Sequence, residues 1–185
     1  MGVHRLSFTL AAIVEGYGDV DAVRVLVQRL APEFIIARPV RQGRGKLVKR
    51  EGLKHAVNIA AANITDAGAV LVLFDADDDC AKELGARLEQ WLAQDFPHIF
   101  CRVVLAVREF EAWIVGGDPE YGVSDPDLTG NLEGRIKDRH GTYKKTVDQP
   151  GHISRSDLDR LRANSRSFRR LDAVINQFKE KAAIA

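Results

Sequence analysis

The stretch AVLVLFDAD, from Ala69 to Asp77, decides the fold class. Its first six residues form an unbroken apolar run, which predicts a strand buried on both faces, as at the centre of a parallel sheet. Asp75 and Asp77 follow where this strand ends. Residues two apart in an extended chain point the same way, so both carboxylates can converge on one point. The stretch therefore predicts a parallel sheet with polar chemistry at its carboxyl edge.

The segments around this strand predict the rest of an α/β sheet. Apolar runs predict strands at residues 6–14, 34–40 and 100–107, in addition to 69–74. Helical spacing of apolar residues predicts helices at 19–30, 51–65 and 79–94. Strands that alternate with helices over short connections indicate a mainly parallel sheet of four strands, flanked by helices on both faces.

The character of the chain changes after residue 115. A chain of 185 residues predicts one domain. We expect residues 1–115 to form the α/β core and residues 116–185 to form a loop and helical extension packed on it. Further helices are predicted at 109–115, 132–139, 155–163 and 168–182, and loops at 42–46 and 142–153.

Charge is balanced overall but unevenly distributed. The chain has 27 Lys and Arg against 26 Asp and Glu, so its net charge does not indicate a nucleic-acid-binding protein. Residues 35–58, however, contain seven basic residues and one acid, and residues 135–185 contain 13 and six. The acids are densest at Asp75 and 77–79. Two basic segments around an acidic cluster suit a protein that attracts a polyanion and holds a divalent metal ion.

Several classes of protein and site are disfavoured. Two cysteines without a Cys-x-x-Cys pair give neither a disulfide framework nor a zinc site. No apolar run is long enough to span a bilayer. The apolar run Phe8–Val14 continues into Glu15-Gly16 without a cleavage site, which indicates a strand and not a signal peptide. We therefore expect a cytoplasmic protein without a membrane partner. The glycines at 16–18 and 43–45 do not complete a dinucleotide-binding or Walker motif.

Acidic residues end two of the predicted strands. Glu15 ends the first strand and Asp75 ends the third. Ligands of open α/β sheets bind beyond the carboxyl ends of the strands, so Glu15 joins Asp75 and Asp77 if these strands are neighbours. Carboxylates placed so close raise one another's pKa, and a hard cation such as Mg²⁺ relieves that repulsion. This pattern predicts an acidic metal site.

Each acid also has a simpler interpretation. Asp19 is able to cap a helix, as are residues 77–79, and Glu15 can be a single polar residue in a turn. An arginine that fills the space between the carboxylates would argue against a metal site. The metal site remains the preferred interpretation because Glu15 and Asp75 end separate strands at the same edge, a coincidence that helix capping does not predict.

Short motifs in this order resemble a known family. Glu15-Gly16-Tyr17-Gly18-Asp19 and Phe74-Asp75-Ala76-Asp77, each after a strand, resemble the Toprim domain of topoisomerases, primases and OLD-family nucleases. The segments REFEAW (108–113), YKKTVD (143–148) and SFRR (167–170) are similar to a Toprim-like domain-of-unknown-function family of bacterial proteins. The resemblance covers most of the chain. OLD-like members have Glu at the place of Asp19, which is a shorter ligand.

The resemblance implies a Toprim-like fold and hydrolysis of phosphodiester bonds in DNA or RNA with two Mg²⁺ or Mn²⁺ ions. Glu15 and Lys145 are then the catalytic residues, with Lys145 neutralising charge on the scissile phosphate. The implied metal ligands are Glu15, Asp19, Asp75, Asp77 and Glu111. Glu109 competes with Glu111 for its place, and Lys144 and Lys145 are equally well explained as surface charges.

The resemblance also implies partners. Phosphates of nucleic acid are expected at Arg41, Arg44, Lys46, Lys144, Arg166, Arg169 and Arg170. OLD-type Toprim domains work with ABC-type ATPases in anti-phage defence, so a separate ATPase is a further expected partner. Two alternatives stay open: a non-catalytic module that binds an ATPase or nucleic acid, and a different metal enzyme such as a phosphatase. Trp91 and Trp113 are expected to be core residues.

Overall fold

The computed structural model describes residues 7–185 and contains a five-stranded parallel sheet. The strands are β1 (Phe8–Val14), β2 (Ile35–Ile36), β3 (Val40–Arg41), β4 (Ala67–Asp75) and β5 (Phe100–Ala106). Their order is β2-β1-β4-β5, with β3 also paired to β1. The long strand β4 lies between β1 and β5, with Val14 opposite Leu73 and Asp75 opposite Ala106. The apolar run that predicts a central strand is confirmed, as is the mainly parallel α/β architecture.

The number of strands differs from the prediction. One strand was expected at residues 34–40, but the chain forms two short strands, β2 and β3, that both pair with β1. Pro39 lies between them and has no N–H to donate, so it interrupts the ladder. The sheet therefore has five strands and not four. Residue Leu6, placed in the first strand by its sequence, lies outside the described residues.

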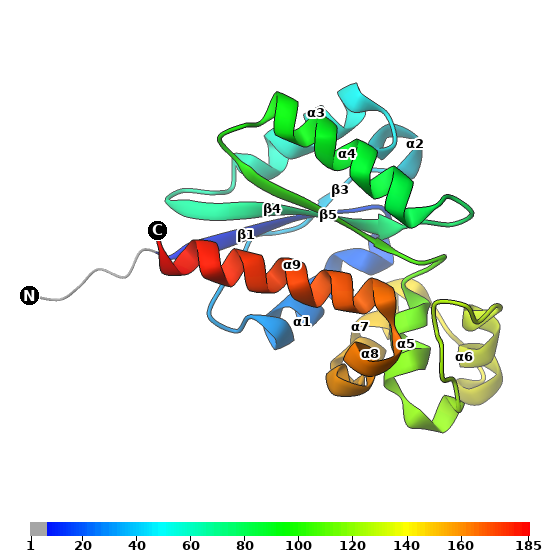
Figure 1. The fold of residues 1–185 in the computed structure, drawn as a ribbon. Helices are drawn as coiled ribbons and strands as arrows, with labels where there is room; N and C mark the ends of the chain where they lie inside the picture. Colours follow the sequence, from blue (N-terminus) through cyan, green and yellow to red (C-terminus); the bar gives the residue numbers. More distant parts are fainter. Residues whose placement is uncertain (1–6) are drawn as a thin grey trace, which may run out of the picture.

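Helices cover both faces of the sheet (Figure 1). The helices are α1 (Tyr17–Leu30), α2 (Arg44–Leu47), α3 (Arg50–Ala61), α4 (Ala81–Asp95), α5 (Glu111–Gly117), α6 (Leu132–His140), α7 (Lys145–Arg155), α8 (Leu158–Asn164) and α9 (Arg166–Ala183), with a short 3₁₀ turn at Pro119–Tyr121. α3 and α4 cover one face, and α1 and α9 cover the other. None of the helices within residues 7–185 has the length and apolar character that crossing a membrane requires.

Two segments predicted as loops are helical. Residues 42–46 were expected to form a flexible basic loop, but α2 begins at Arg44 and anchors the segment through the buried Leu47. Residues 142–153 were expected to form a loop because they contain Pro150, yet α7 runs through this proline. A proline inside a helix costs about 3 kcal/mol relative to alanine. The cost is outweighed because α7 packs along α1 and buries Gln149 and Ile153.

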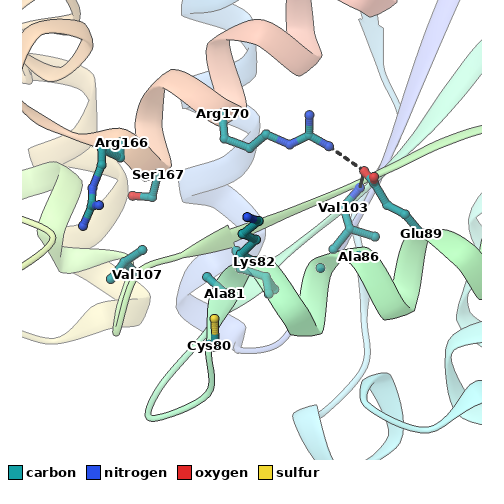
Figure 2. A pocket seen from close by; sticks show the side chains of 12 residues that line it. Cys80, Ala81, Lys82, Ala86, Glu89, Val103, Val107, Arg166, Ser167 and Arg170 are labelled. Carbon is teal, nitrogen blue, oxygen red and sulfur yellow. Dashed lines mark hydrogen bonds and ion pairs between the residues drawn. The ribbon is translucent and has the colours of Figure 1, made fainter.

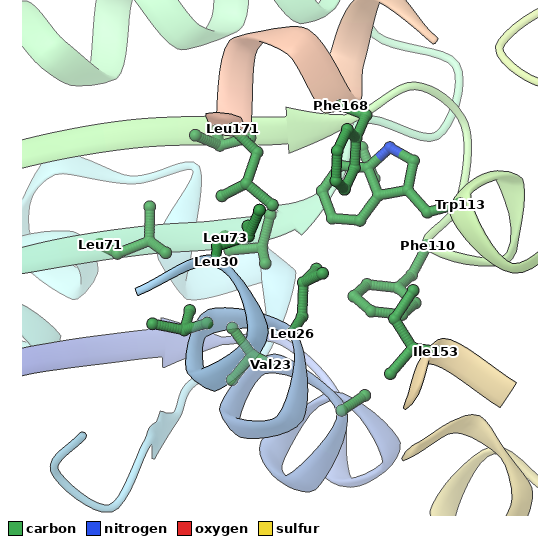
Figure 3. Packing of buried hydrophobic residues seen from close by; sticks show 14 of the residues in the cluster. Val23, Leu26, Leu30, Leu71, Leu73, Phe110, Trp113, Ile153, Phe168 and Leu171 are labelled. Carbon is green, nitrogen blue, oxygen red and sulfur yellow. The ribbon is translucent and has the colours of Figure 1, made fainter. Parts of the chain in front are cut away.

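The core beneath the sheet joins the first half of the chain to the C-terminal helices (Figure 3). Leu26 of α1 and Leu73 of β4 lie in one cluster with Trp113 of α5 and Phe168 of α9. Trp113 is fully buried, as expected, and its Nε1 donates a hydrogen bond of 2.9 Å to Ser167 Oγ. The indole therefore fixes α5 against α9, and α5 carries Glu111 at its first residue.

Candidate functional site

Acidic residues gather at one edge of the sheet, which we call the carboxyl rim: the residues that end or follow β1, β4 and β5. Glu15 follows the last residue of β1, and Asp75 is the last residue of β4. Because β1 and β4 are hydrogen-bonded neighbours, the strand arrangement on which the predicted site depends is confirmed. Asp19 lies in the first turn of α1, and Asp77 follows β4 in the next loop.

Glu15 carries a carboxylate oxygen that has lost contact with water without gaining a partner. Its Oε2 is buried and accepts no hydrogen bond from any described residue. Burial raises the pKa of Glu15, and the negative charges of Asp77 and Asp19 raise it further. Arg44 and Lys145 act in the opposite direction but do not restore the ordinary value. A buried carboxylate oxygen without a partner costs free energy unless a ligand or a proton occupies it.

Asp75 lies in the same electrostatic environment. Its pKa is raised well above its usual value, first by burial and then by the charges of Asp19 and Glu111. Lys145 lowers the pKa, as does the N–H of Phe110, which donates to Asp75 Oδ1 at 2.8 Å. The carboxylates from α1, β4 and α5 are thus close enough for their charges to repel one another.

Asp77 stands in a tight loop together with an arginine. Its backbone is left-handed at φ 50°, and its N–H donates to the carbonyl of Arg108, also left-handed at φ 62°, across 3.0 Å. Such conformations cost about 1–3 kcal/mol each and cluster at functional sites. Arg44 Nε lies 3.2 Å from Asp77 Oδ2, and the same guanidinium pairs with Asp79 and donates to the carbonyls of Asp75 and Ala76.

Arg44 therefore lies where an arginine argues against a metal site. It neutralises part of the acidic loop, yet the pKa values of Glu15 and Asp75 remain raised in its presence. Two cations, Arg44 and Lys145, face these acids, and their charge does not cancel the repulsion at the strand ends.

Asp19 performs the capping role that its sequence position allows. Its Oδ2 accepts a hydrogen bond of 2.9 Å from the N–H of Gly16, the residue that precedes α1. Its Oδ1 accepts a hydrogen bond of 3.0 Å from Gln149 Nε2 of α7. Both oxygens are thus engaged within the protein, and direct coordination of a metal by Asp19 stays a prediction.

Glu111 is the most deeply buried acid of the site. Its side chain is 0% exposed, and it accepts hydrogen bonds from the hydroxyl of Tyr143 at 2.9 Å and from Lys145 Nζ, which lies 3.1 Å from the nearer oxygen. Burial lowers the pKa of Lys145, but the charges of Glu111, Asp75 and Glu109 outweigh it and raise the pKa overall. Lys145 is therefore held as a cation that faces the carboxyl rim.

Glu109 differs from Glu111 in its surroundings. It is half-buried, and its pKa is raised by burial and by the charge of Glu111. Glu111 is satisfied by Tyr143 and Lys145, whereas Glu109 retains access to solvent. The choice between the two acids as a metal ligand stays open.

Three residues have roles in this site that the sequence does not predict. The sequence suggests Arg44 only for phosphate binding and Tyr143 only as part of the YKKTVD motif, and it indicates no role for Gln149. The signal for Gln149 is its spacing: it follows Lys145 by four residues, and on a helix such residues share one face. That signal is hidden while residues 142–153 are interpreted as a loop.

Comparison with known protein families assigns the chain. The family model described as a domain of unknown function (DUF4276) matches residues 14–175, which include every carboxylate discussed above. The chain belongs to this DUF4276 family. The domain-of-unknown-function part of the sequence resemblance is thereby confirmed, whereas its connection to Toprim domains stays a prediction. No curated protein and no solved structure matches the chain.

The basic residues assigned to nucleic acid fall into two groups in this DUF4276 chain. Some are engaged within the protein: Arg44 as described, Arg169 with the carbonyls of Arg162 and Ala163, and Arg170 with Glu89 at 2.7 Å. The other four have solvent-exposed side chains: Arg41, Lys46, Lys144 and Arg166.

The donor set of the DUF4276 rim suits a hard cation. Within residues 7–185, no three Asp, Glu, His or Cys side chains already stand in an arrangement that could hold a metal ion. To bind an ion, the carboxylates would have to rotate toward it. Glu15 Oε2 is buried without a hydrogen-bond partner, so coordination of an ion would offset the free-energy cost of its burial. Carboxylate oxygens are the ligands that Mg²⁺ and Mn²⁺ prefer.

Proposed function

We propose that this protein is a Mg²⁺- or Mn²⁺-dependent nuclease of the Toprim type, which hydrolyses phosphodiester bonds in DNA or RNA. The observation that carries the proposal is the unpartnered Oε2 of Glu15. It lies among carboxylates where burial first, and then the charges of neighbouring acids, raise the pKa of Glu15 and Asp75. Such a cluster is costly for folding, and a bound cation offsets the cost.

Each residue of the rim has a role in this proposal. Asp75 and Asp77 supply oxygens for divalent ions, and Glu15 binds an ion or accepts the proton of the attacking water. The ions supply polarisation of the phosphate and activation of a water. Lys145, kept charged by Glu111, faces the same rim and stabilises negative charge on the phosphate. Asp19 orients the start of α1 through Gly16 and binds α7 through Gln149.

The test is cleavage of plasmid DNA and of RNA by purified protein with Mg²⁺ or Mn²⁺. We expect Asp75→Ala to abolish cleavage, because it removes the central carboxylate of the rim. Asp138→Ala is the matched control, since Asp138 is exposed on α6 and makes no hydrogen bond or ion pair within residues 7–185. Equal cleavage by both variants would refute the proposal.

A second function is favoured by Arg44. Its pairing with Asp77 and Asp79 satisfies part of the acidic loop without a metal, as expected of a non-catalytic module that binds nucleic acid or a separate ABC-type ATPase. Calorimetry with Mn²⁺ separates the two functions. If the protein is a nuclease, the wild type binds Mn²⁺ in the micromolar to millimolar range and Asp75→Ala does not. If it is a non-catalytic module, neither the wild type nor Asp75→Ala releases heat on addition of Mn²⁺.

A further inference from the structure

An exposed aromatic ring lies at one end of the carboxyl rim. Tyr17 is the first residue of α1, two positions after Glu15, and it is 71% exposed. The guanidinium carbon of Arg41, at the end of β3, lies 4.1 Å from the centre of its ring. Single exposed apolar side chains are common, but an aromatic ring stacked by arginine beside an acidic cluster is a surface on which an unpaired base can stack.

A groove lies at the other end of the rim, along the free edge of β5, between α4 and the start of α9 (Figure 2). We call it the β5 groove. It has a volume of about 560 Å³, and its wall is largely apolar, with Val103 and Leu105 of β5 and Val107, just after the strand, contributing to it. This volume lies within the range of about 300–1,000 Å³ that is typical of small-ligand sites, which suits one nucleotide.

Cations border the β5 groove. Lys82 of α4 and Arg166 and Arg170 of α9 line it, and among the lining residues that the structure describes Glu89 is the only acid. Arg170 pairs with Glu89 at 2.7 Å, and Glu89 also accepts the N–H of Val103 at 3.1 Å, which closes one part of the strand edge. Lys82 and Arg166 have no ion pair within the described part of the chain. The groove therefore complements an anion that also presents an apolar surface.

The ring and the groove flank the acidic cluster. The strands run in the order β3, β1, β4 and β5. Arg41 on β3 therefore lies on one side of Glu15 and Asp75, and the β5 groove lies on the other side. Three strand spacings of about 4.8 Å place the two edges about 14 Å apart. The acidic loop also contacts the groove side, since the N–H of Asp77 donates to the carbonyl of Arg108, which follows Val107.

We infer that the carboxyl rim is a track for single-stranded nucleic acid, with an unpaired base stacked on Tyr17 and Arg41 and a nucleotide of the same strand in the β5 groove. This inference rests on the proposed function, because it names the substrate class of the same rim. A base can stack on Tyr17 only when it is free of its complementary strand, and the groove has room for a single nucleotide. Lys82 and Arg166 then contact backbone phosphates.

The experiment measures binding without catalysis. Fluorescence anisotropy follows a labelled single strand of about 12 nucleotides, as DNA and separately as RNA, with metal-free protein in a chelating buffer. The same sequence as a duplex is the comparison. We expect the single strand to bind at least tenfold more tightly than the duplex. DNA and RNA differ in the 2′-hydroxyl, so the tighter of the two identifies the sugar that the rim accepts.

Variants test the two ends of the track separately. Tyr17→Ala weakens single-strand binding about tenfold, within the range expected for one lost base stack, while Tyr17→Phe retains it. Lys82→Glu weakens binding and reduces the salt dependence by about one phosphate contact. The matched controls are Arg87→Ala, which removes an arginine stacked over Trp91 on α4, and Lys54→Glu on α3.

Three results would overturn the inference: a duplex that binds as tightly as the single strand, a Tyr17→Ala protein indistinguishable from Arg87→Ala, or polyglutamate that displaces the strand as well as an unlabelled strand does. These results are distinct from failure of the proposed function. If the protein binds the single strand through Tyr17 and Lys82 but cleaves nothing with Mn²⁺, the single-strand track is supported and the nuclease function is refuted. If the protein cleaves plasmid but binds the strand equally well after Tyr17→Ala, the nuclease function is supported and the track is refuted.

Discussion

Two carboxylates at the carboxyl rim are withdrawn from water in different ways. Glu111, at the start of α5, is fully buried, and Tyr143 and Lys145 satisfy its oxygens. Glu15, after β1, has a buried oxygen with no partner within residues 7–185. Its pKa is raised by burial and by neighbouring acids. The fold therefore supplies hydrogen-bond donors to Glu111 but leaves one oxygen of Glu15 without a donor.

The difference separates a part of the rim that stabilises the folded state from a part that destabilises it. The Glu111 region joins α5 to α7 and holds Lys145 in place, so its contacts stabilise the native state. The Glu15 and Asp75 region places like charges close together in a partly buried environment, which destabilises the native state. Substitutions in the two regions should therefore change stability in opposite directions.

The largest expected effect is that of Glu111→Ala. It leaves the hydroxyl of Tyr143 buried without an acceptor and removes the partner of Lys145. Breaking such a buried interaction should lower the free energy of unfolding by about 3 kcal/mol, as measured by denaturant titration. Glu33→Ala is the control, because Glu33 pairs only loosely with Lys179, at 3.9 Å, and its side chain is 53% exposed. A loss below about 0.5 kcal/mol, typical of surface substitutions, would show that Glu111 does not support the fold.

The sequence predicts the parts of this site that depend on hydrophobic pattern. The apolar runs that end at Val14 and Phe74 are long enough to identify β1 and β4 as buried parallel strands. Once these strands are neighbours, the positions of Glu15 and Asp75 at one edge follow from chain direction alone. Strand pattern thus predicts where carboxylates lie along the sheet.

The sequence does not predict which partner each carboxylate finds. Arg44 reaches the acidic loop because residues 44–47 turn into a helix anchored by Leu47, and a four-residue helix has no periodic signal. Gln149 reaches Asp19 because α7 continues through Pro150 against local preference, held by its packing on α1. Both contacts depend on tertiary packing that overrides local propensity.

A smaller effect is expected where the two regions meet, at Gly18 of α1. A Cβ built there would lie 2.5 Å from Gln149 Oε1 and 2.9 Å from the backbone carbon of Lys145. Gly18→Ala should therefore push α7 from α1 and lower the free energy of unfolding by about 2 kcal/mol, as overpacking does. Gly45→Ala is the matched control, since a Cβ there meets nothing within 4 Å. If both variants unfold at the same denaturant concentration, the close packing of α1 on α7 does not hold Lys145 and Gln149 in place.

The smallest effect has the opposite sign and tests the costly region directly. Asn at position 75 can still accept the N–H of Phe110 but carries no charge, so Asp75→Asn should raise the free energy of unfolding of metal-free protein by about 1 kcal/mol near neutral pH. The measurement is denaturant titration of both proteins in chelating buffer over a range of pH.

The pH dependence of that gain follows from the direction of the pKa shift. The pKa of Asp75 is raised in the folded protein, so the folded state binds more protons than the unfolded state between the unfolded and folded pKa values. Wild-type stability due to this group is therefore fully present below the unfolded pKa and is lost as the pH rises through the folded one. The advantage of Asp75→Asn should accordingly shrink as the pH falls toward about 4, near the unfolded pKa of aspartate. An advantage that stays constant with pH, or a variant less stable than wild type, would mean that burial and neighbouring acids do not raise the pKa of Asp75, and the contrast between Glu15 and Glu111 would then lose its electrostatic basis.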